Sequence, residues 1–269
     1  MKLAFKHILI PFDGSEQSIV ALHSAVFFTK KFDAQLTVVY IQEKSSENEI
    51  KLLLDKNAEG VSFQFIHKKG KAFKGIIDAA KETDSDLIIM GTHGVSSGFE
   101  EFWMGNTSYK VVNLSKCPVL TMREKANFNN FKSIVLPIDT SFESRQKVPF
   151  AISLAKQFGA TIHVLGLSVD NDKESEHQIN GYTRQVKSSI EEEGVNYTFE
   201  KRLGGNITKT TIDYATSINA DLIIIMTEQE AQIGSFFLGK FAQQMVNHSP
   251  IPVFSLSPRE DLTVTDARI

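Results

Sequence analysis

The sequence predicts an α/β fold built from two tandem domains, and three observations lead to this prediction. Short apolar runs, such as residues 8–10, 36–41 and 87–90, alternate along the chain with longer amphipathic stretches. Such runs are typical of parallel strands that helices cover on both faces. The length of 269 residues favours about two domains. Segments of the first half also recur in the second half in the same order, which indicates an internal duplication.

The first half is expected to hold five strands that alternate with helices. The expected strands lie at residues 8–10, 36–41, 61–66, 87–90 and 118–122. The helices between them are expected from residue 15, at 50–60, around 76–80 and from 106–108. Ser15 is the expected N-cap of the first helix, because its side-chain oxygen can accept a hydrogen bond from a free N–H of the first turn. Elements that alternate in this way form a doubly wound parallel sheet with right-handed crossovers.

The second half repeats four segments of the first. The matched pairs are 134–141 with 8–15, 221–226 with 86–90, 236–240 with 102–106, and 252–256 with 118–122. Four matches in one order favour duplication over coincidence. We therefore expect one domain at 1–123, a polar linker at 124–131, a second domain at 132–258 and a charged tail without periodicity at 259–269.

Composition excludes several classes of function. Hydrophobic residues make up 42% of the chain, charged residues 23%, and the formal net charge is −3. This balance gives no reason to expect nucleic acid or an anionic membrane as a partner. The single cysteine, Cys117, rules out an intrachain disulfide and a multi-cysteine metal site, and its apolar surroundings predict a buried, unreactive thiol. No apolar run approaches the roughly 18 residues that a membrane span needs, and Asp13 precedes any run of signal-peptide length, so a cytoplasmic protein is expected.

Residues 90–110 are the stretch with the clearest functional signal. Gly91, Gly94 and Gly105 lie between an expected buried strand and the helix expected from 106–108. A loop of this kind can bring bare backbone N–H groups close to a ligand oxygen, and the helix N-terminus adds unsatisfied donors and partial positive charge. The stretch therefore favours phosphate binding. The alternative is that the glycines only shape turns.

Two motifs together resemble a known family. Pro-Phe-Asp at 11–13 follows the first expected strand, and Met-Gly-Thr-His-Gly at 90–94 follows the fourth. In this combination the chain resembles the universal stress protein family in a tandem two-domain form, which implies two Rossmann-like domains, each with a five-stranded, mostly parallel sheet and helices on both faces. The nucleotide-binding branch has a Gly-x-x-Gly, nine residues, then Gly-Ser/Thr pattern. Here ten residues, 95–104, precede Gly105, and Asn106 stands where Ser or Thr is usual.

The resemblance implies a site for ATP or AMP, with or without Mg2+, in the first domain. Asp13 would contact the nucleoside, the backbone near Tyr40 and Ile41 would recognise adenine, and the loop would hold ribose and phosphates. The expected binding residues are Pro11, Asp13, Ser15, Ile41, Met90, Gly91, His93, Gly94, Gly105, Asn106 and Thr107. For Asp13 the alternative is an Asx turn that only caps the helix. For His93 we expect a hydrogen bond that fixes the loop rather than acid–base catalysis.

The second copy differs at the glycine loop. Thr-Glu-Gln-Glu at 227–230 stands where the first copy has 91–94, so both glycines are missing. Glu228 and Glu230 would repel phosphate, with no backbone nest to offset the repulsion. Asp139, the counterpart of Asp13, is kept. One nucleotide site per chain is therefore predicted, in the first half.

Two functions from different classes follow. The first is a nucleotide-binding stress-response regulatory protein. The second is a pseudo-dimeric scaffold in which nucleotide binding has been lost from both copies. A nucleotide-using ligase or electron-transfer flavoprotein relative is a third, weaker reading, because no Ser-Gly-Gly-x-Asp-Ser motif is present. No enzyme is expected, since the chain has neither a Gly-x-x-x-x-Gly-Lys-Ser/Thr loop nor metal-binding histidine spacing, although slow ATP hydrolysis is left open.

Relatives pair their fifth strands across a two-fold axis. By this resemblance, residues 118–122 and 252–256 are expected to meet antiparallel within one chain, which would cover two apolar edges. The chain would then be a built-in pseudo-dimer, with a homodimer of chains as a further option and unknown proteins as downstream partners.

Overall fold

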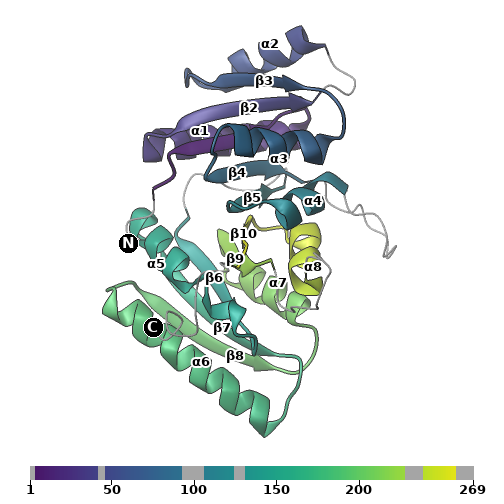
Figure 1. The fold of residues 1–269 in the computed structure, drawn as a ribbon. Coiled ribbons are helices and arrows are strands. Elements are labelled where there is room, and N and C mark those ends of the chain that lie inside the picture. Colours follow the sequence, from purple (N-terminus) through teal and green to yellow (C-terminus); the bar gives the residue numbers. More distant parts are fainter. Residues whose placement is uncertain (1–3, 42–45, 93–105, 124–130, 228–238, 259–269) are drawn as a thin grey trace. The chain divides into compact units, whose positions relative to one another are not determined.

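The computed structural model describes residues 4–41, 46–92, 106–123, 131–227 and 239–258 (Figure 1). Contacts divide the chain into two compact units, whose main segments are residues 4–129 and 130–245. Each unit is an α/β sheet of parallel strands, so the predicted fold class is confirmed. The predicted limits of the linker and the tail fall largely outside the described residues and stay predictions.

The first unit contains a five-stranded sheet in the order β3-β2-β1-β4-β5, with every neighbouring pair parallel. Its strands are β1 (His7–Pro11), β2 (Gln35–Ile41), β3 (Gln64–Lys68), β4 (Leu87–Gly91) and β5 (Val119–Met122). Its helices are α1 (Glu16–Phe32), α2 (Glu47–Asn57), α3 (Ala72–Glu82) and α4 (Asn106–Leu114). From β1 the strand order continues through β2 to β3 on one side and through β4 to β5 on the other. The order therefore reverses between β1 and β4, which is the switch point of a doubly wound sheet.

The third strand lies later than expected, at Gln64–Lys68 instead of 61–66. Residues 61–63 still belong to the connection from α2, because Val61 N donates to Ala58 O at 2.9 Å. Pairing with β2 begins only where Gln64 stands opposite Thr37. Tertiary pairing thus sets the start of β3, and an apolar run alone does not define it.

The second unit repeats this arrangement in the order β8-β7-β6-β9-β10. Its strands are β6 (Ser133–Ile138), β7 (Thr161–Ser168), β8 (Tyr197–Leu203), β9 (Leu222–Met226) and β10 (Val253–Leu256). Its helices are the short 3₁₀ helix η1 (Glu143–Arg145), α5 (Val148–Phe158), α6 (Lys173–Glu192), α7 (Ile207–Ser217) and α8 (Lys240–His248).

The central strands form the core of each unit. Ile8, Leu9 and Ile10 of β1 are 0% exposed, and all five residues of β9 are buried. Burial on both faces is what uninterrupted apolar runs predict for parallel strands. Cys117 precedes β5 and is half-buried, and burial raises the pKa of its thiol, which favours the unreactive protonated form.

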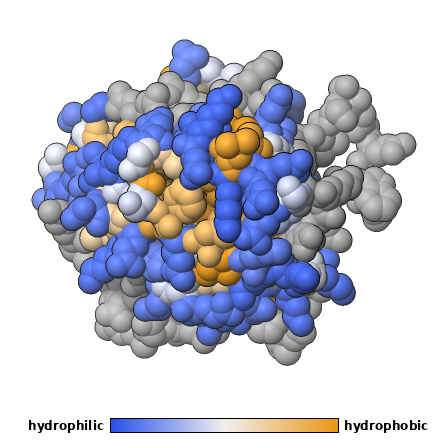
Figure 2. All heavy atoms as spheres, turned by 90° about the horizontal axis from the view of Figure 1, so that it is seen from above, coloured by the Kyte–Doolittle hydropathy of each residue, from blue (hydrophilic) through white to orange (hydrophobic). Residues whose placement is uncertain are grey.

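The face drawn in Figure 2 is mainly hydrophilic, with an apolar area near the middle of the view. Large exposed apolar side chains within the described ranges are Leu52, Leu114, Val169 and Phe199. Among the helices of these ranges, none has both the length and the apolar character to cross a membrane.

An aspartate before the fourth strand of each unit holds the start of the first strand. Asp86 accepts hydrogen bonds from Lys6 N at 2.7 Å and from His7 N at 3.3 Å. Asp221 accepts from Lys132 N at 2.8 Å and from Ser133 N at 2.9 Å. These two aspartates are therefore structural equivalents in the two copies.

Strand pairing changes the alignment of the repeat by one residue at the ends of β4 and β9. Ile8 pairs with Leu87, and its counterpart Ile134 pairs with Leu222. The fifth residue of β4 is Gly91 and the fifth residue of β9 is Met226. Met226 is thus the counterpart of Gly91 rather than of Met90, and Thr227 is the counterpart of Thr92. The next residue of each copy hydrogen-bonds alike, because Thr92 N donates to Met122 O and Thr227 N to Leu256 O, each at 2.8 Å.

We predict that Asp221→Ala lowers the free energy of unfolding by about 1–3 kcal/mol, because two backbone N–H groups lose a charged acceptor. Urea denaturation followed by circular dichroism measures this loss. The control is Asp213→Ala, which removes an exposed ion pair with Lys209 on α7 and should change stability by less than about 0.5 kcal/mol. Equal effects of the two substitutions would contradict the structural role of Asp221.

Candidate functional site

The candidate site lies at the carboxyl ends of the strands of the first unit, on both sides of its switch point. We call this region the carboxyl edge of the first unit; it comprises the ends of β1, β2 and β4 and the chain that follows each. Pro11 pairs with Val39, and Leu9 pairs with Ile88, so these strands end close to one level. Phe12 N continues the pairing by donating to Val39 O at 3.0 Å. Open α/β sheets bind ligands at this position.

The turn between β1 and α1 is shaped by two side chains. Asp13 Oδ1 accepts a hydrogen bond from Ser15 N at 3.0 Å, which forms an Asx turn. Ser15 Oγ accepts from Ser18 N at 3.2 Å, so Ser15 is the N-cap of α1. Asp13 nevertheless stays exposed. The Asx turn, which the sequence analysis gave as the alternative to a ligand role for Asp13, is therefore present. It also fixes the position of the exposed carboxylate beside the N-terminus of α1.

Gly91 lets the end of β4 approach the first turn of α1. A Cβ atom at Gly91 would lie 2.4 Å from Gln17 O and 2.5 Å from Gln17 C. Those atoms are backbone, so they cannot move aside without shifting the helix. Packing alone therefore explains why residue 91 is a glycine, whether or not a ligand binds nearby.

The chain beyond Gly91 is anchored before it leaves the described residues. Thr92 is 6% exposed, and its N and Oγ1 both donate to Met122 O, at 2.8 and 3.3 Å. Residues 93–105 follow, so the predicted site residues His93, Gly94 and Gly105 lie outside the described residues. The chain returns at Asn106, which opens α4 and is the first of the three expected helix starts. Thr107 lies half-buried in the first turn of α4.

The remaining predicted residues, at the ends of β1, β2 and β4, differ in how far their side chains are buried. Pro11 is half-buried at the end of β1. Ile41 is 7% exposed at the end of β2, and Met90 is 4% exposed within β4. Burial leaves the side chains of Ile41 and Met90 in the core, so at the edge these positions would act through their backbone.

Sequence reasoning missed a polar cluster beside the end of β2. His67 of β3 lies over Tyr40 with ring centroids 5.4 Å apart, and His67 Nδ1 is 2.7 Å from Glu47 Oε2. Glu47 opens α2, whose N-terminus has a capping box formed by Ser46 and Glu49. The Ser-x-x-Glu spacing was the signal that could have placed the start of α2 here. Helix α2 also lies against the β1–α1 turn, because a Cβ at Gly14 would lie 3.1 Å from Leu53 Cδ1.

The corresponding turn of the second unit begins alike and then diverges. Asp139 Oδ1 accepts from Ser141 N at 2.8 Å and from Ser141 Oγ, which repeats the Asx turn. The chain then forms only η1 before α5 starts at Val148, whereas α1 of the first unit starts three residues after Asp13. Pro149 lies in the first turn of α5, where a residue without an N–H is tolerated.

Lys147 lies buried at this break. Its side chain is 1% exposed, Nζ donates to Ser144 O at 2.5 Å, and the carboxylate of Asp139 is its electrostatic partner. Burial lowers the pKa of Lys147 from 10.5 to about 8, and the charge of Asp139 opposes this shift. A buried lysine was not foreseen, since its sequence neighbours gave no signal that it would point inward.

Comparisons with known proteins agree with the repeat. A family model described as "Universal stress protein family" matches residues 4–55, 42–123 and 130–255. The universal stress protein YxiE of Bacillus subtilis is 32% identical over 148 residues, which cover 44% of this chain and 99% of YxiE. The universal stress protein MJ0531 of Methanocaldococcus jannaschii is 29% identical over 142 residues, covering 45% of this chain and 83% of that protein.

Solved structures of similar length share the fold. A universal stress protein from Archaeoglobus fulgidus superposes with a TM-score of 0.71 at 22% identity, covering 93% of this chain and 98% of that chain. A functionally unknown protein from Pseudomonas aeruginosa superposes with a TM-score of 0.74 at 18% identity, covering 95% and 93%. At these identities the likeness supports the two-copy fold and says nothing of ligands.

We predict that Gly91→Ala destabilises the protein by about 1–3 kcal/mol even without ligand, because the new Cβ would overlap the backbone of Gln17. Thermal unfolding of the ligand-free protein measures this. Gly181→Ala is the matched control: position 181 lies within α6, has nothing within 4 Å of a built Cβ, and should gain about 0.5–1 kcal/mol. A neutral Gly91→Ala would contradict the close approach.

We also predict that Lys147 makes stability depend on pH. Its pKa is about 8 when folded, below the ordinary 10.5, so the unfolded chain binds more protons between these pH values. The free energy of unfolding should therefore rise with pH across this window, by up to about 3 kcal/mol. Urea titrations at several pH values test this. Lys147→Met should remove that part of the slope, whereas Lys156→Met, at an exposed ion pair of α5, should keep it.

Proposed function

This chain belongs to the universal stress protein family, and we propose that it is a cytoplasmic stress-response regulatory protein that binds one adenine nucleotide at the carboxyl edge of its first unit. The observation that carries the proposal is the meeting of three features at that edge. Exposed Asp13 sits beside the N-terminus of α1, β2 ends at Ile41, and β4 ends at Gly91 and the anchored Thr92.

The chemistry of this edge suits a nucleotide. A carboxylate held by an Asx turn can accept hydrogen bonds from ribose hydroxyls or from an adenine amino group. The N-termini of α1 and α4 add backbone donors and positive partial charge for phosphates. The backbone at the end of β2 offers N–H and C=O groups to the adenine edge. The ligand is proposed to be ATP or AMP.

Binding, rather than catalysis, is the proposed activity. Within the described residues, no group of three or more His, Cys, Asp or Glu side chains is arranged to hold a metal ion. Any Mg2+ would therefore be expected to arrive with the phosphates of the nucleotide and not through a preformed protein site. Signalling is proposed to pass through the protein surface to partner proteins.

The alternative function is a pseudo-dimeric scaffold that has lost nucleotide binding in both copies. The longer spacing before Gly105 and the presence of Asn106 favour this alternative. In either function the two copies are proposed to act as a built-in pseudo-dimer, and pairing of the fifth strands stays a prediction.

We predict one ATP or AMP site per chain by isothermal titration calorimetry, with and without Mg2+. Asp13→Ala should weaken binding by about 10- to 100-fold, because a charged hydrogen-bond acceptor is lost. The matched control is Asp139→Ala in the second unit, which should leave the affinity unchanged. Two equivalent sites per chain would contradict the single-site proposal. No nucleotide in the denatured purified protein by mass spectrometry, together with no thermal shift in millimolar ATP, would favour the scaffold.

A further inference from the structure

Helix α2 is tied by its first turn to β3, the outermost strand of the first unit. Glu47 Oε2 lies 2.7 Å from Nδ1 of His67 on β3, and Glu47 Oε1 lies 2.6 Å from Nζ of Lys51, one turn along the helix. The hydrogen bonds from Lys51 and His67 lower the pKa of Glu47, which therefore stays ionised at neutral pH. Since a carboxylate only accepts hydrogen bonds, Nδ1 of His67 is the donor in this contact.

The ring of His67 is held in place by the neighbouring strand. It lies over Tyr40 of β2, with ring centroids 5.4 Å apart and an angle of 31° between the ring planes. Tyr40 is also the strand partner of His67 and is 1% exposed, so the ring rests on a buried neighbour. The side chains of His67 and Glu47 are 26% and 37% exposed. Their contact is therefore only partly open to water, which strengthens it relative to a fully exposed pair.

Further along its length, α2 covers Gly14, the residue that follows Asp13. A Cβ built on Gly14 would lie 3.1 Å from Leu53 Cδ1 and 3.3 Å from Ile50 Cδ1. Gly14 has a φ of +81°, which glycine adopts without strain. Ile50 is fully buried. The turn between β1 and α1 thus rests against α2, and a shift of this helix would remove the support of the turn.

Strand register identifies the residue of the second unit that corresponds to His67. The prolines of β1 and β6 occupy the same place in the repeat, and each has a partner on the second strand of its unit. The residue after that partner is Tyr40 in the first unit and Gly166 in the second. Their own partners on the outermost strands are His67 and Lys201, respectively. Lys201 is therefore the counterpart of His67.

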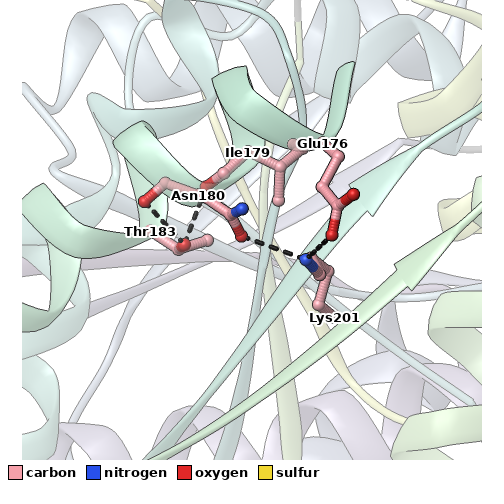
Figure 3. A network of polar contacts seen from close by, with 5 residues as sticks. All are labelled: Glu176, Ile179, Asn180, Thr183 and Lys201. Atoms are coloured by element: carbon pink, nitrogen blue, oxygen red, sulfur yellow. Dashed lines mark hydrogen bonds and ion pairs between the residues drawn. The ribbon is translucent and has the colours of Figure 1, made fainter. Parts of the chain in front are cut away.

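Lys201 ties α6 to β8 as His67 ties α2 to β3. Its Nζ donates to Glu176 Oε1 at 2.5 Å and to Asn180 Oδ1 at 3.1 Å, as Figure 3 shows. Glu176 lies in the first turn of α6, and Glu47 lies in the first turn of α2. Each unit thus has an acidic side chain at the start of this helix and a nitrogen donor at the same position of the outermost strand.

Helix α6 also reaches the turn after the first strand of its unit. Thr140 corresponds to Gly14 in the repeat, and Gln178 Nε2 of α6 donates to Thr140 O at 3.0 Å. The first unit makes this contact with apolar side chains and the second makes it with a hydrogen bond. In both copies, therefore, the helix after the second strand joins the outermost strand to the turn that carries the aspartate.

We propose that α2, held by the contact between Glu47 and His67, positions the turn that carries Asp13, so that Glu47 and His67 are positioning residues of the candidate site. The bridge is built from different side chains in the two copies, which indicates that the connection matters more than any one residue. Helix α2 has 11 residues and α6 has 20, so the hold on α2 depends more on its single contact with the strand. The effect on a ligand rests on the proposed nucleotide function, whereas the coupling of α2 to the turn does not.

Hydrogen–deuterium exchange of the full chain without nucleotide, followed by mass spectrometry at pH 7, tests the coupling. His67→Leu removes the donor and should speed exchange about three- to tenfold in residues 46–54 of α2 and in residues 12–19 of the turn. His67→Gln, whose amide can still donate to Glu47, should stay within about twofold of the unmodified chain. The matched control is Glu82→Gln, which removes the ion pair between Lys68 of β3 and α3 and should leave both segments unchanged.

A second variant separates the contact from other effects of residue 67. Glu47→Ala leaves the capping box of Ser46 and Glu49 in place and should speed exchange in the same two segments. The double variant with His67→Leu should exchange no faster than the faster single variant, because both substitutions remove one interaction. Faster exchange in 46–54 with 12–19 unchanged would overturn the proposal. An equal effect of Glu82→Gln would also overturn it, because the cause would then be a general loosening of β3.

Isothermal titration with ATP tests the consequence for the site. His67→Leu should weaken binding about three- to tenfold, His67→Gln should restore it, and Glu82→Gln should leave it unchanged. Unchanged affinity of His67→Leu, in a chain that binds ATP, would overturn the positioning role. If the unmodified chain binds no ATP, the proposed nucleotide function fails, and exchange in residues 12–19 still decides whether α2 holds the turn.

Discussion

The contact between the end of β4 and the first turn of α1 is the constraint on which the candidate site depends. It exists because Gly91 has no side chain to separate the strand from the backbone of Gln17. The contact brings the start of α1, with Asp13 before it, next to the chain that leaves β4. In the second unit Met226 removes this possibility, and the differences at η1, Lys147 and α5 are all consistent with that one exchange.

Comparing the two copies distinguishes the contacts that the fold requires from the features of the candidate site. Asp86 and Asp221 make the same backbone contacts, and Thr92 and Thr227 anchor their strands alike. These contacts hold the sheet together and are kept in both copies. The differences described above, at Gly91 and Met226 and in the turns after β1 and β6, lie at the carboxyl ends of strands, where side chains can change without loss of the fold.

Much of the fold could be predicted because apolar runs and turn residues act locally. The strands around Ile8 and Ile88, the N-cap at Ser15 and the start of α4 at Asn106 follow from such signals. The alignment of β9 with β4 was wrong by one residue, because both strands are uniformly apolar and an apolar sequence does not define its register. The pairing of Leu87 and Leu222 with their partners defines it.

The candidate site was harder to predict, because burial and helix geometry decide what its residues do. The exposure of Asp13 and the burial of Lys147 depend on neighbours distant in sequence.

The difference between Gly91 in the first copy and Met226 in the second also has a consequence for protein engineering. The glycine-containing segment after β4 could not be moved to β9 by itself. In the second unit η1 stands where α1 begins in the first, and α5 starts only at Val148. An engineered second site would require exchanging the loop together with the end of β9 and the segment that contains η1 and the start of α5.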